Sequence, residues 1–187
     1  MTEMTPNTRE KKPARERKPT HPLASAPRQS PASDAWKEFA NHLVAALVGL
    51  EEDEYLILKV KDSHRYVQFM DQGRYGMRME SVSDYYLPED DHLSEGDYDY
   101  LLKLGWHAPT QVPGTAGHDP DGSPNYYLDL AHPLPIPDMA VMAVLTLANV
   151  HNVGHPGGLE YDAQSTTGMS IRFPHLPIRR RAEEARA

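Results

Sequence analysis

The first regular pattern of apolar residues along the chain has the spacing of an α-helix. Its residues are Trp36, Phe39, Ala40, Leu43, Val44 and Leu47. Intervals of three and four residues bring side chains to one face of an α-helix. Ser33 or Asp34 can cap free backbone N–H groups at its start, and Gly49 can end it. The pattern therefore predicts an amphipathic helix that begins at Ser33 or Asp34 and ends at Gly49.

Segments rich in β-favouring residues follow this helix, at residues 55–60, 65–70 and 76–82. The first two flank the turn-like sequence KDSH, which predicts a hairpin. In the third segment, Met77, Met79 and Ser81 alternate with the residues between them, as in a strand with one face against a core. Three consecutive strands predict an antiparallel meander.

A second helix is predicted between Ser94 and Gly105. Ser94 suits the N-cap, and the carboxylates of Glu95 and Asp97 complement the helix dipole in the first turn. Gly105 supplies the C-terminal stop. The residues expected to face inward are Tyr98, Leu101 and Leu102.

A fourth strand at residues 125–130 leads into a third helix, which starts near Pro137 and runs to about His151. Its apolar residues are Met139, Val141, Met142, Val144, Leu145 and Leu147. Because they leave almost no polar face, we expect this helix to be buried between the sheet and outer elements as the main core element. Residues 157–163 predict a further short strand, whereas residues 169–173 fit no single element.

These elements predict an α+β fold, with an N-terminal helix, an antiparallel sheet of about four to five strands, and two further helices packed on the sheet. A single domain at residues 34–175 accounts for them, since the chain has 187 residues and 17 prolines. Residues 1–33 are rich in Pro, Lys, Arg and Ser without periodicity, which predicts a disordered basic arm. Residues 176–187 predict a flexible, Arg-rich tail.

Charge is distributed unevenly along a chain whose net charge is −8. Residues 1–33 carry seven basic against three acidic side chains, whereas residues 34–178 carry eight against 22. An acidic body repels phosphate backbones, so the folded domain is expected to bind a protein or peptide rather than nucleic acid. The basic arm could contact nucleic acid, an acidic partner or the acidic body, or stay solvated.

Cysteine is absent, which excludes disulfides, thiolate metal sites and a cysteine nucleophile. The sequence has neither a signal-peptide core nor an apolar run of about 18 residues. We therefore expect a cytoplasmic protein that does not associate with a membrane.

Two histidines are candidates for a metal site. His151 and His155 have the i, i+4 spacing that brings two imidazoles together on a helix. Gly154 and Pro156 should end the helix there, and no HExxH pattern supplies a third ligand. A metal-dependent or other small enzyme using these histidines and nearby acidic residues is the alternative function.

Other polar clusters give catalysis less support. A loop with oxygen ligands at Asp119, Asp121, Ser123 and Asn125 loosely resembles a calcium loop but has no bidentate Glu at its end. The carboxylate runs Glu51–Glu54 and Glu89–Asp91 are typical of solvated loops, and Gly168–Ser170 lacks the flanking pattern of an activated serine. We expect no enzymatic activity and no cofactor or metal.

Ten tyrosines and eight methionines stand out, because such side chains suit adaptable contact surfaces. The candidates for peptide contact lie on or beside the predicted strands: Tyr66, Met77, Met79, Tyr85, Tyr126 and Tyr127. The simpler alternative for each of them is a place in the core. Structural roles are expected for Trp36, Leu101, Gly105 and Trp106.

Several local sequences between Asp34 and Ala163 resemble the TY-Chap domain family. They are YVQFM, MESVSDYYL, LSEGDYDYLLKLGWHAP, PNYYLDL and GLEYDA. The most specific of them contains an LxxLGWxxP string, which carries Leu101, Leu104, Gly105, Trp106 and Pro109. That family is grouped with YbjN-like proteins and type III secretion chaperones as a peptide-binding fold.

The resemblance implies an α+β fold that binds peptides or partner proteins and brings no catalytic residues. A bound segment would add as a strand at a sheet edge or lie as a helix in a groove. A homodimer formed through the apolar stripes is a further alternative. The resemblance also draws attention to Glu80, Trp106 and Asn125, which the residues alone predict as a solvent-facing strand residue, a packing anchor and a turn residue.

Overall fold

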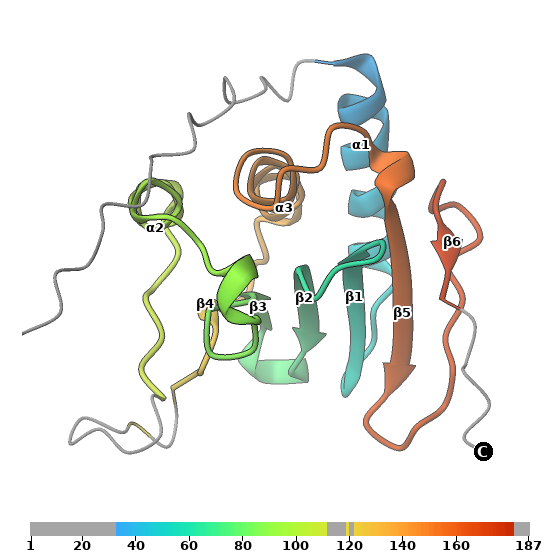
Figure 1. The fold of residues 1–187 in the computed structure, drawn as a ribbon. Helices are drawn as coiled ribbons and strands as arrows, with labels where there is room; N and C mark the ends of the chain where they lie inside the picture. The colour runs from blue at the N-terminus through green and yellow to red at the C-terminus, as the bar shows by residue number, and fades with distance from the viewer. Residues whose placement is uncertain (1–32, 112–118, 120–121, 182–187) are drawn as a thin grey trace, which may run out of the picture.

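The computed structural model describes residues 33–111, 119 and 122–181, which form an α+β fold with α1 and α3 on one side of a single sheet (Figure 1). Residues 1–32 of the predicted arm at 1–33, and residues 182–187 of the predicted tail, lie outside the described residues. The sheet has six strands in the order β4-β3-β2-β1-β5-β6. The predicted fold class is confirmed.

The predicted meander forms the centre of the sheet. It consists of β1 (Glu54–Val60), β2 (Tyr66–Asp71) and β3 (Met77–Ser81), and β4 (Tyr126–Leu130) pairs antiparallel with β3. In this register Leu56 lies opposite Phe69, Phe69 opposite Met79 and Met79 opposite Leu128. The strand alternation therefore aligns one apolar row across four strands. Short 3-10 helices occupy connections at η1 (Gly73–Tyr75), η2 (Glu89–Asp91) and η3 (Pro156–Gly158).

The first two helices begin and end at the predicted residues. α1 (Asp34–Val48) is capped by the Ser33 hydroxyl, which accepts from the backbone N–H of Trp36 at 3.4 Å. α2 (Glu95–Leu104) begins with a capping box between Ser94 and Asp97 and ends at Gly105, whose φ is +103°.

One expectation for α2 was wrong. Leu101 is fully buried, whereas Leu102 is 51% exposed. Leu102 lies about 100° around the helix from Leu101, on the side of α2 that faces solvent.

α3 (Ile136–Asn149) packs against α1 and β2, as its apolar composition predicts, but it is not buried on all sides. Val141 is 50% exposed because the fold has two layers and leaves the outer face of α3 in solvent. The inner face contributes Met139, Ala143 and Leu147 to the core. Thr146 on α3 accepts a hydrogen bond from Trp106 Nε1 at 3.0 Å, which fixes the segment after α2. Within the part of the chain described, no helix is long and apolar enough to cross a membrane.

β5 completes the expected four to five strands, and β6 adds a sixth. β5 (Leu159–Ser165) confirms the predicted strand and pairs antiparallel with β1. β6 (Arg179–Arg180) pairs parallel with β5, in a segment that the sequence assigned to the flexible tail. Leu176, just before it, is buried against the core. Two arginines carry no strand pattern, so this pairing depends on the tertiary contacts around them.

Candidate functional site

The two faces of the sheet carry different side chains, because neighbouring residues on a strand point to opposite sides. On β1 and β2, Leu56, Leu58, Val67 and Phe69 are fully buried beneath the helices. The residues between them point to the other side, which we refer to as the open face. Its members on the five longer strands are Tyr55, Ile57, Lys59, Tyr66, Gln68, Met70, Arg78, Glu80, Tyr127, Asp129, Glu160, Asp162 and Gln164.

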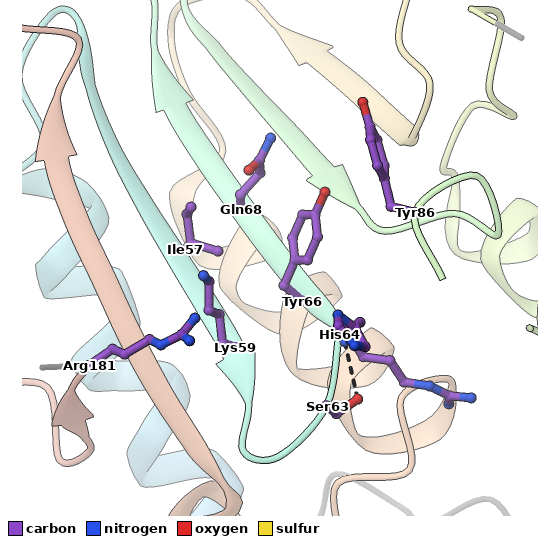
Figure 2. Close-up of a pocket in the computed structure, with 9 residues that line it drawn as sticks. Ile57, Lys59, Ser63, His64, Tyr66, Gln68, Tyr86 and Arg181 are labelled. Atoms are coloured by element: carbon purple, nitrogen blue, oxygen red, sulfur yellow. Dashed lines mark hydrogen bonds between the residues drawn. The ribbon is translucent and has the colours of Figure 1, made fainter. Parts of the chain in front are cut away.

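A hollow of about 390 Å³ lies on the open face, near the turn that joins β1 to β2 (Figure 2). Ile57, Tyr66 and Gln68 form its floor. Its other lining residues come from β1, from the turn, from the loop after β3 and from the segment after β6: Lys59, Ser63, His64, Arg65, Tyr86 and Arg181. We refer to it as the first hollow. It joins segments that are far apart in the sequence.

Glu80 is held beside this floor in a network of neutral donors. It is 8% exposed and accepts hydrogen bonds from Ser123 Oγ at 2.5 Å, from Asn125 Nδ2 at 3.3 Å and from Gln68 Nε2. The prediction of a solvent-facing Glu80 is therefore wrong, because residues 122–125 pack over it. Asn125, predicted as a turn residue, is buried directly before β4.

The same network leaves two hydrogen-bonding groups on the floor without a described partner. Asn125 Nδ2 donates to the Tyr66 hydroxyl at 3.1 Å, so the hydroxyl's own proton is left for another acceptor. Gln68 uses its Nε2 on Glu80, and among the described residues nothing donates to its Oε1. Burial raises the pKa of Tyr66, which keeps the hydroxyl protonated at neutral pH. The floor thus offers one donor and one acceptor to a ligand.

Positive charge surrounds the first hollow, although the molecule as a whole is acidic. The Arg65 guanidinium donates to the backbone carbonyls of Val150 at 3.1 Å and Asp91 at 2.9 Å, so these bonds do not neutralise it. The Lys59 ammonium makes no ion pair with any described residue. Arg181 lies 3.6 Å from the Glu160 carboxylate and is partly neutralised.

A second hollow, of about 370 Å³, is mainly apolar. It is lined by Ser83, Asp84, Tyr85, Tyr98, Pro109, Pro124 and Tyr126. The Asp84 carboxylate accepts from the Tyr98 hydroxyl and from the backbone N–H of Leu93 at 2.8 Å. Burial, then the bond to Asp84, raises the pKa of Tyr98, and burial raises the pKa of Tyr126 to about 12. Both phenols therefore stay neutral, and the hollow suits an apolar side chain.

The structure separates the predicted contact residues into two groups. Met77 and Met79 are fully buried on the helix-facing side, where they cannot touch a partner unless the core opens. Tyr126 is 7% exposed and forms part of the wall of the second hollow. Tyr66 lies in the first hollow and Tyr85 in the second, while Tyr127 lies on the open face beside Arg78.

The residues expected to have structural roles lie in the core or at the end of a helix. Trp36, Leu101 and Trp106 are all buried in the core. Gly105 adopts a φ of +103°, where other residues are strained.

Several residues of the first hollow were not singled out from the sequence, among them Ile57, Lys59 and Gln68. Their alternation with Leu56, Leu58, Val67 and Phe69 was a usable signal, because it places them together on the opposite face. Tyr86 and Arg181 had no such signal, since their positions depend on how a loop and the segment after β6 fold back.

The two histidines of the alternative metal site lie in different environments. His151 is 3% exposed, and its Nε2 lies 3.0 Å from Ser81 Oγ beneath the sheet. Burial lowers its pKa to about 3, with a smaller contribution from Arg65. His155 is exposed, and its Nδ1 accepts from the backbone N–H of Gly157 at 2.9 Å. No cluster of three or more potential metal ligands occurs among the described residues.

The calcium-like loop is engaged in other contacts. Ser123 and Asn125 donate to Glu80, and Asp121 lies outside the described residues. Glu89 and Asp90 are exposed on the short helix η2, and Glu51 and Glu52 on the turn before β1.

Comparison with known proteins agrees with this architecture. Residues 29–165 match a family described as T3SS (YopN, CesT) and YbjN peptide-binding chaperone 3, TY-Chap3. No curated protein and no solved structure matches the chain. Because the match covers most of the chain, including α1, the meander, α3 and β5, this protein belongs to the TY-Chap3 family of peptide-binding chaperones.

Proposed function

We propose that this chain is a cytoplasmic, non-enzymatic chaperone-like adaptor that holds a segment of another polypeptide on the open face of its sheet, centred on the first hollow. The observation that carries the proposal is the floor of that hollow. An apolar Ile57 lies beside a donor on Tyr66 and an acceptor on Gln68, neither of which has a partner among the described residues. A peptide group carries one acceptor, its C=O, and one donor, its N–H, so it can bond both the Tyr66 hydroxyl and Gln68 Oε1.

The face is a better candidate than the sheet edges. At one edge, Tyr127 of β4 already exchanges backbone hydrogen bonds with His107, at 2.9 and 3.1 Å. At the other edge, β6 consists of two residues. A peptide that adds as a strand requires a row of free backbone groups, and the described edges offer only a short one.

A crosslinking pull-down from the native cytosol tests this proposal. The full chain is compared with a Tyr66→Ala, Gln68→Ala double variant and with a Tyr75→Ala control, which removes an exposed tyrosine from η1 away from the hollow. Circular dichroism first establishes that all three are folded. Proteins captured by the wild type and the control but lost with the double variant support the open face. An equal catch for all three places binding elsewhere, and an empty catch contradicts a binding role.

A further inference from the structure

Two hollows with different chemistry lie on either side of one aromatic pair. Tyr86 lines the first hollow and Tyr85 lines the second. Their ring centroids are 4.8 Å apart and the rings meet edge to face at 78°. We propose that the two hollows form one bipartite site, which selects an extended polypeptide segment carrying a carboxylate side chain near an apolar one. This proposal rests on the proposed function and specifies its partner.

The carboxylate belongs in the first hollow because the charge there opposes that of the rest of the molecule. Lys59 has no ion pair among the described residues, and Arg65 binds only carbonyl oxygens in the contacts seen. Glu160 lies 3.6 Å from Arg181 and opposite Lys59 in the β1–β5 register, so it offsets part of the charge of these two cations. A molecule with net charge −8 attracts basic segments through its overall field, so a local excess of cations favours an acidic group at this place.

The floor can bind the same carboxylate or the backbone beside it. The Tyr66 hydroxyl has a proton to donate, and a carboxylate oxygen is a strong acceptor. Gln68 Oε1 can accept a backbone N–H from the bound segment. Ile57 contributes an apolar surface on β1, opposite Gln68.

The apolar side chain belongs in the second hollow. Its walls are two prolines, Pro109 and Pro124, and the rings of Tyr98 and Tyr126, which lie stacked with centroids 6.3 Å apart. Its single carboxylate, Asp84, already accepts two hydrogen bonds. The groups left to face a ligand are therefore mainly carbon, and burial of a leucine-sized side chain there is favourable.

The connection between the hollows is held in place. Ser83 Oγ donates to the Pro124 carbonyl at 2.6 Å and accepts from the Tyr85 backbone N–H at 3.2 Å. The Ser83 backbone N–H donates to Asn125 Oδ1 at 3.3 Å. Asn125 also contacts Glu80 and Tyr66, so one network supports the floor of the first hollow and the wall of the second.

The test is a fluorescence-anisotropy titration of the full chain with short synthetic peptides. Each peptide carries one Glu and one Leu at varied separation, and matched peptides replace Glu by Gln or Lys, or Leu by Ser. Lys59→Glu is compared with Lys37→Glu, an equal charge change on the exposed side of α1. Tyr85→Ser is compared with Tyr75→Ser, since both tyrosines are exposed.

The proposal predicts that Glu→Gln in the peptide weakens binding roughly five-fold or more, equivalent to about 1 kcal/mol. Lys59→Glu should abolish this preference while Lys37→Glu retains it. Tyr85→Ser should reduce the preference for Leu over Ser, and Tyr75→Ser should not. Loss of the Glu preference in Lys37→Glu as well would contradict a local cationic site, as would stronger binding of the Lys peptides.

A further outcome separates the two proposals. If peptides bind equally with Glu or Gln and are still lost in the Tyr66→Ala, Gln68→Ala variant, the bipartite selection is wrong and the proposed function stands. If no peptide binds and the pull-down is also empty, both are wrong. If a single-stranded oligonucleotide binds more tightly than any peptide, and Lys59→Glu abolishes that binding, the ligand of the first hollow is nucleic acid and the peptide proposal is wrong.

Discussion

The two sides of the sheet differ in the side chains that they carry. On the side that packs against α1 and α3, the side chains of β1 and β2 are apolar and fully buried. On the open face, the same two strands carry partly exposed residues: Ile57, Lys59, Tyr66 and Gln68. The helix-facing side gains stability from apolar area removed from water. The open face has less area to bury and holds polar groups with bonding capacity left over. Strand alternation therefore lets one sheet stabilise the fold with one side and present, in the proposed function, a binding surface with the other.

The largest expected effect is a difference in stability between variants at two neighbouring residues of β2. Phe69→Ala removes a fully buried ring and should lower the free energy of unfolding by about 3 to 5 kcal/mol, because it leaves a cavity in the core. Gln68→Ala, on the open face, should lower it by about 1 kcal/mol or less. Urea denaturation of both variants measures the difference. Equal losses would show that the open face is part of the stabilising core.

The next effect concerns a titrating group beneath the sheet. The folded pKa of His151, about 3, is below its ordinary value of 6.5, so the unfolded chain binds the proton more readily. Stability should therefore be complete above about pH 6.5 and fall below it by roughly 1 kcal/mol per pH unit.

His151→Gln is the matched variant, because glutamine can still bond Ser81 Oγ but does not titrate. Chemical denaturation between neutral and acidic pH should show a shallower loss of stability in this variant than in the wild type. Parallel pH profiles for the two proteins would mean that His151 is solvated in solution.

A smaller loss is expected for the buried carboxylate of the open face. Glu80→Ala removes the acceptor shared by Ser123, Asn125 and Gln68, and should lower the free energy of unfolding by about 2 kcal/mol. It should also weaken peptide binding, because the floor of the first hollow loses its support. Glu38→Ala removes an exposed carboxylate from α1, away from the open face, and serves as the control. Unchanged peptide affinity in Glu80→Ala would show that the hydrogen bonds to Glu80 are not needed for peptide binding.

The smallest effect lies away from both faces. Ser94→Ala removes the N-cap of α2 and should lower the free energy of unfolding by about 1 kcal/mol, with no change in peptide affinity. Thermal denaturation and the same titration measure both quantities. Loss of affinity in this variant would connect α2 to the binding surface.

Local patterns predicted most of the fold. Ser33, Ser94 and Gly105 act as the caps expected of them, because capping depends on residues within one turn. Alternation also placed Met77 and Met79 on the core side of their strand, which was a better guide than the tendency of methionine to occur at contact surfaces. β6 escaped prediction because its two arginines pair only where β5 offers them an edge.

The candidate site was harder to predict because its parts come together only in the folded chain. Ile57 and Gln68 could be grouped by strand register, but Tyr86 and Arg181 reach the first hollow through tertiary packing. Glu80 looked solvated because the residues that bury it, Ser123 and Asn125, lie more than forty positions later in the chain. Neither spacing nor composition carries that information.

Site-specific photo-crosslinking tests the central claim, binding on the open face, most directly. A photoreactive aromatic residue replaces Tyr86, which is 50% exposed beside the first hollow, or Tyr75, which is 67% exposed on η1. The same full chain, at equal expression in its native cells, is irradiated and analysed for covalent adducts. Specific polypeptide adducts from position 86 and none from position 75 are predicted; adducts from position 75 alone, or none from either, would contradict the account.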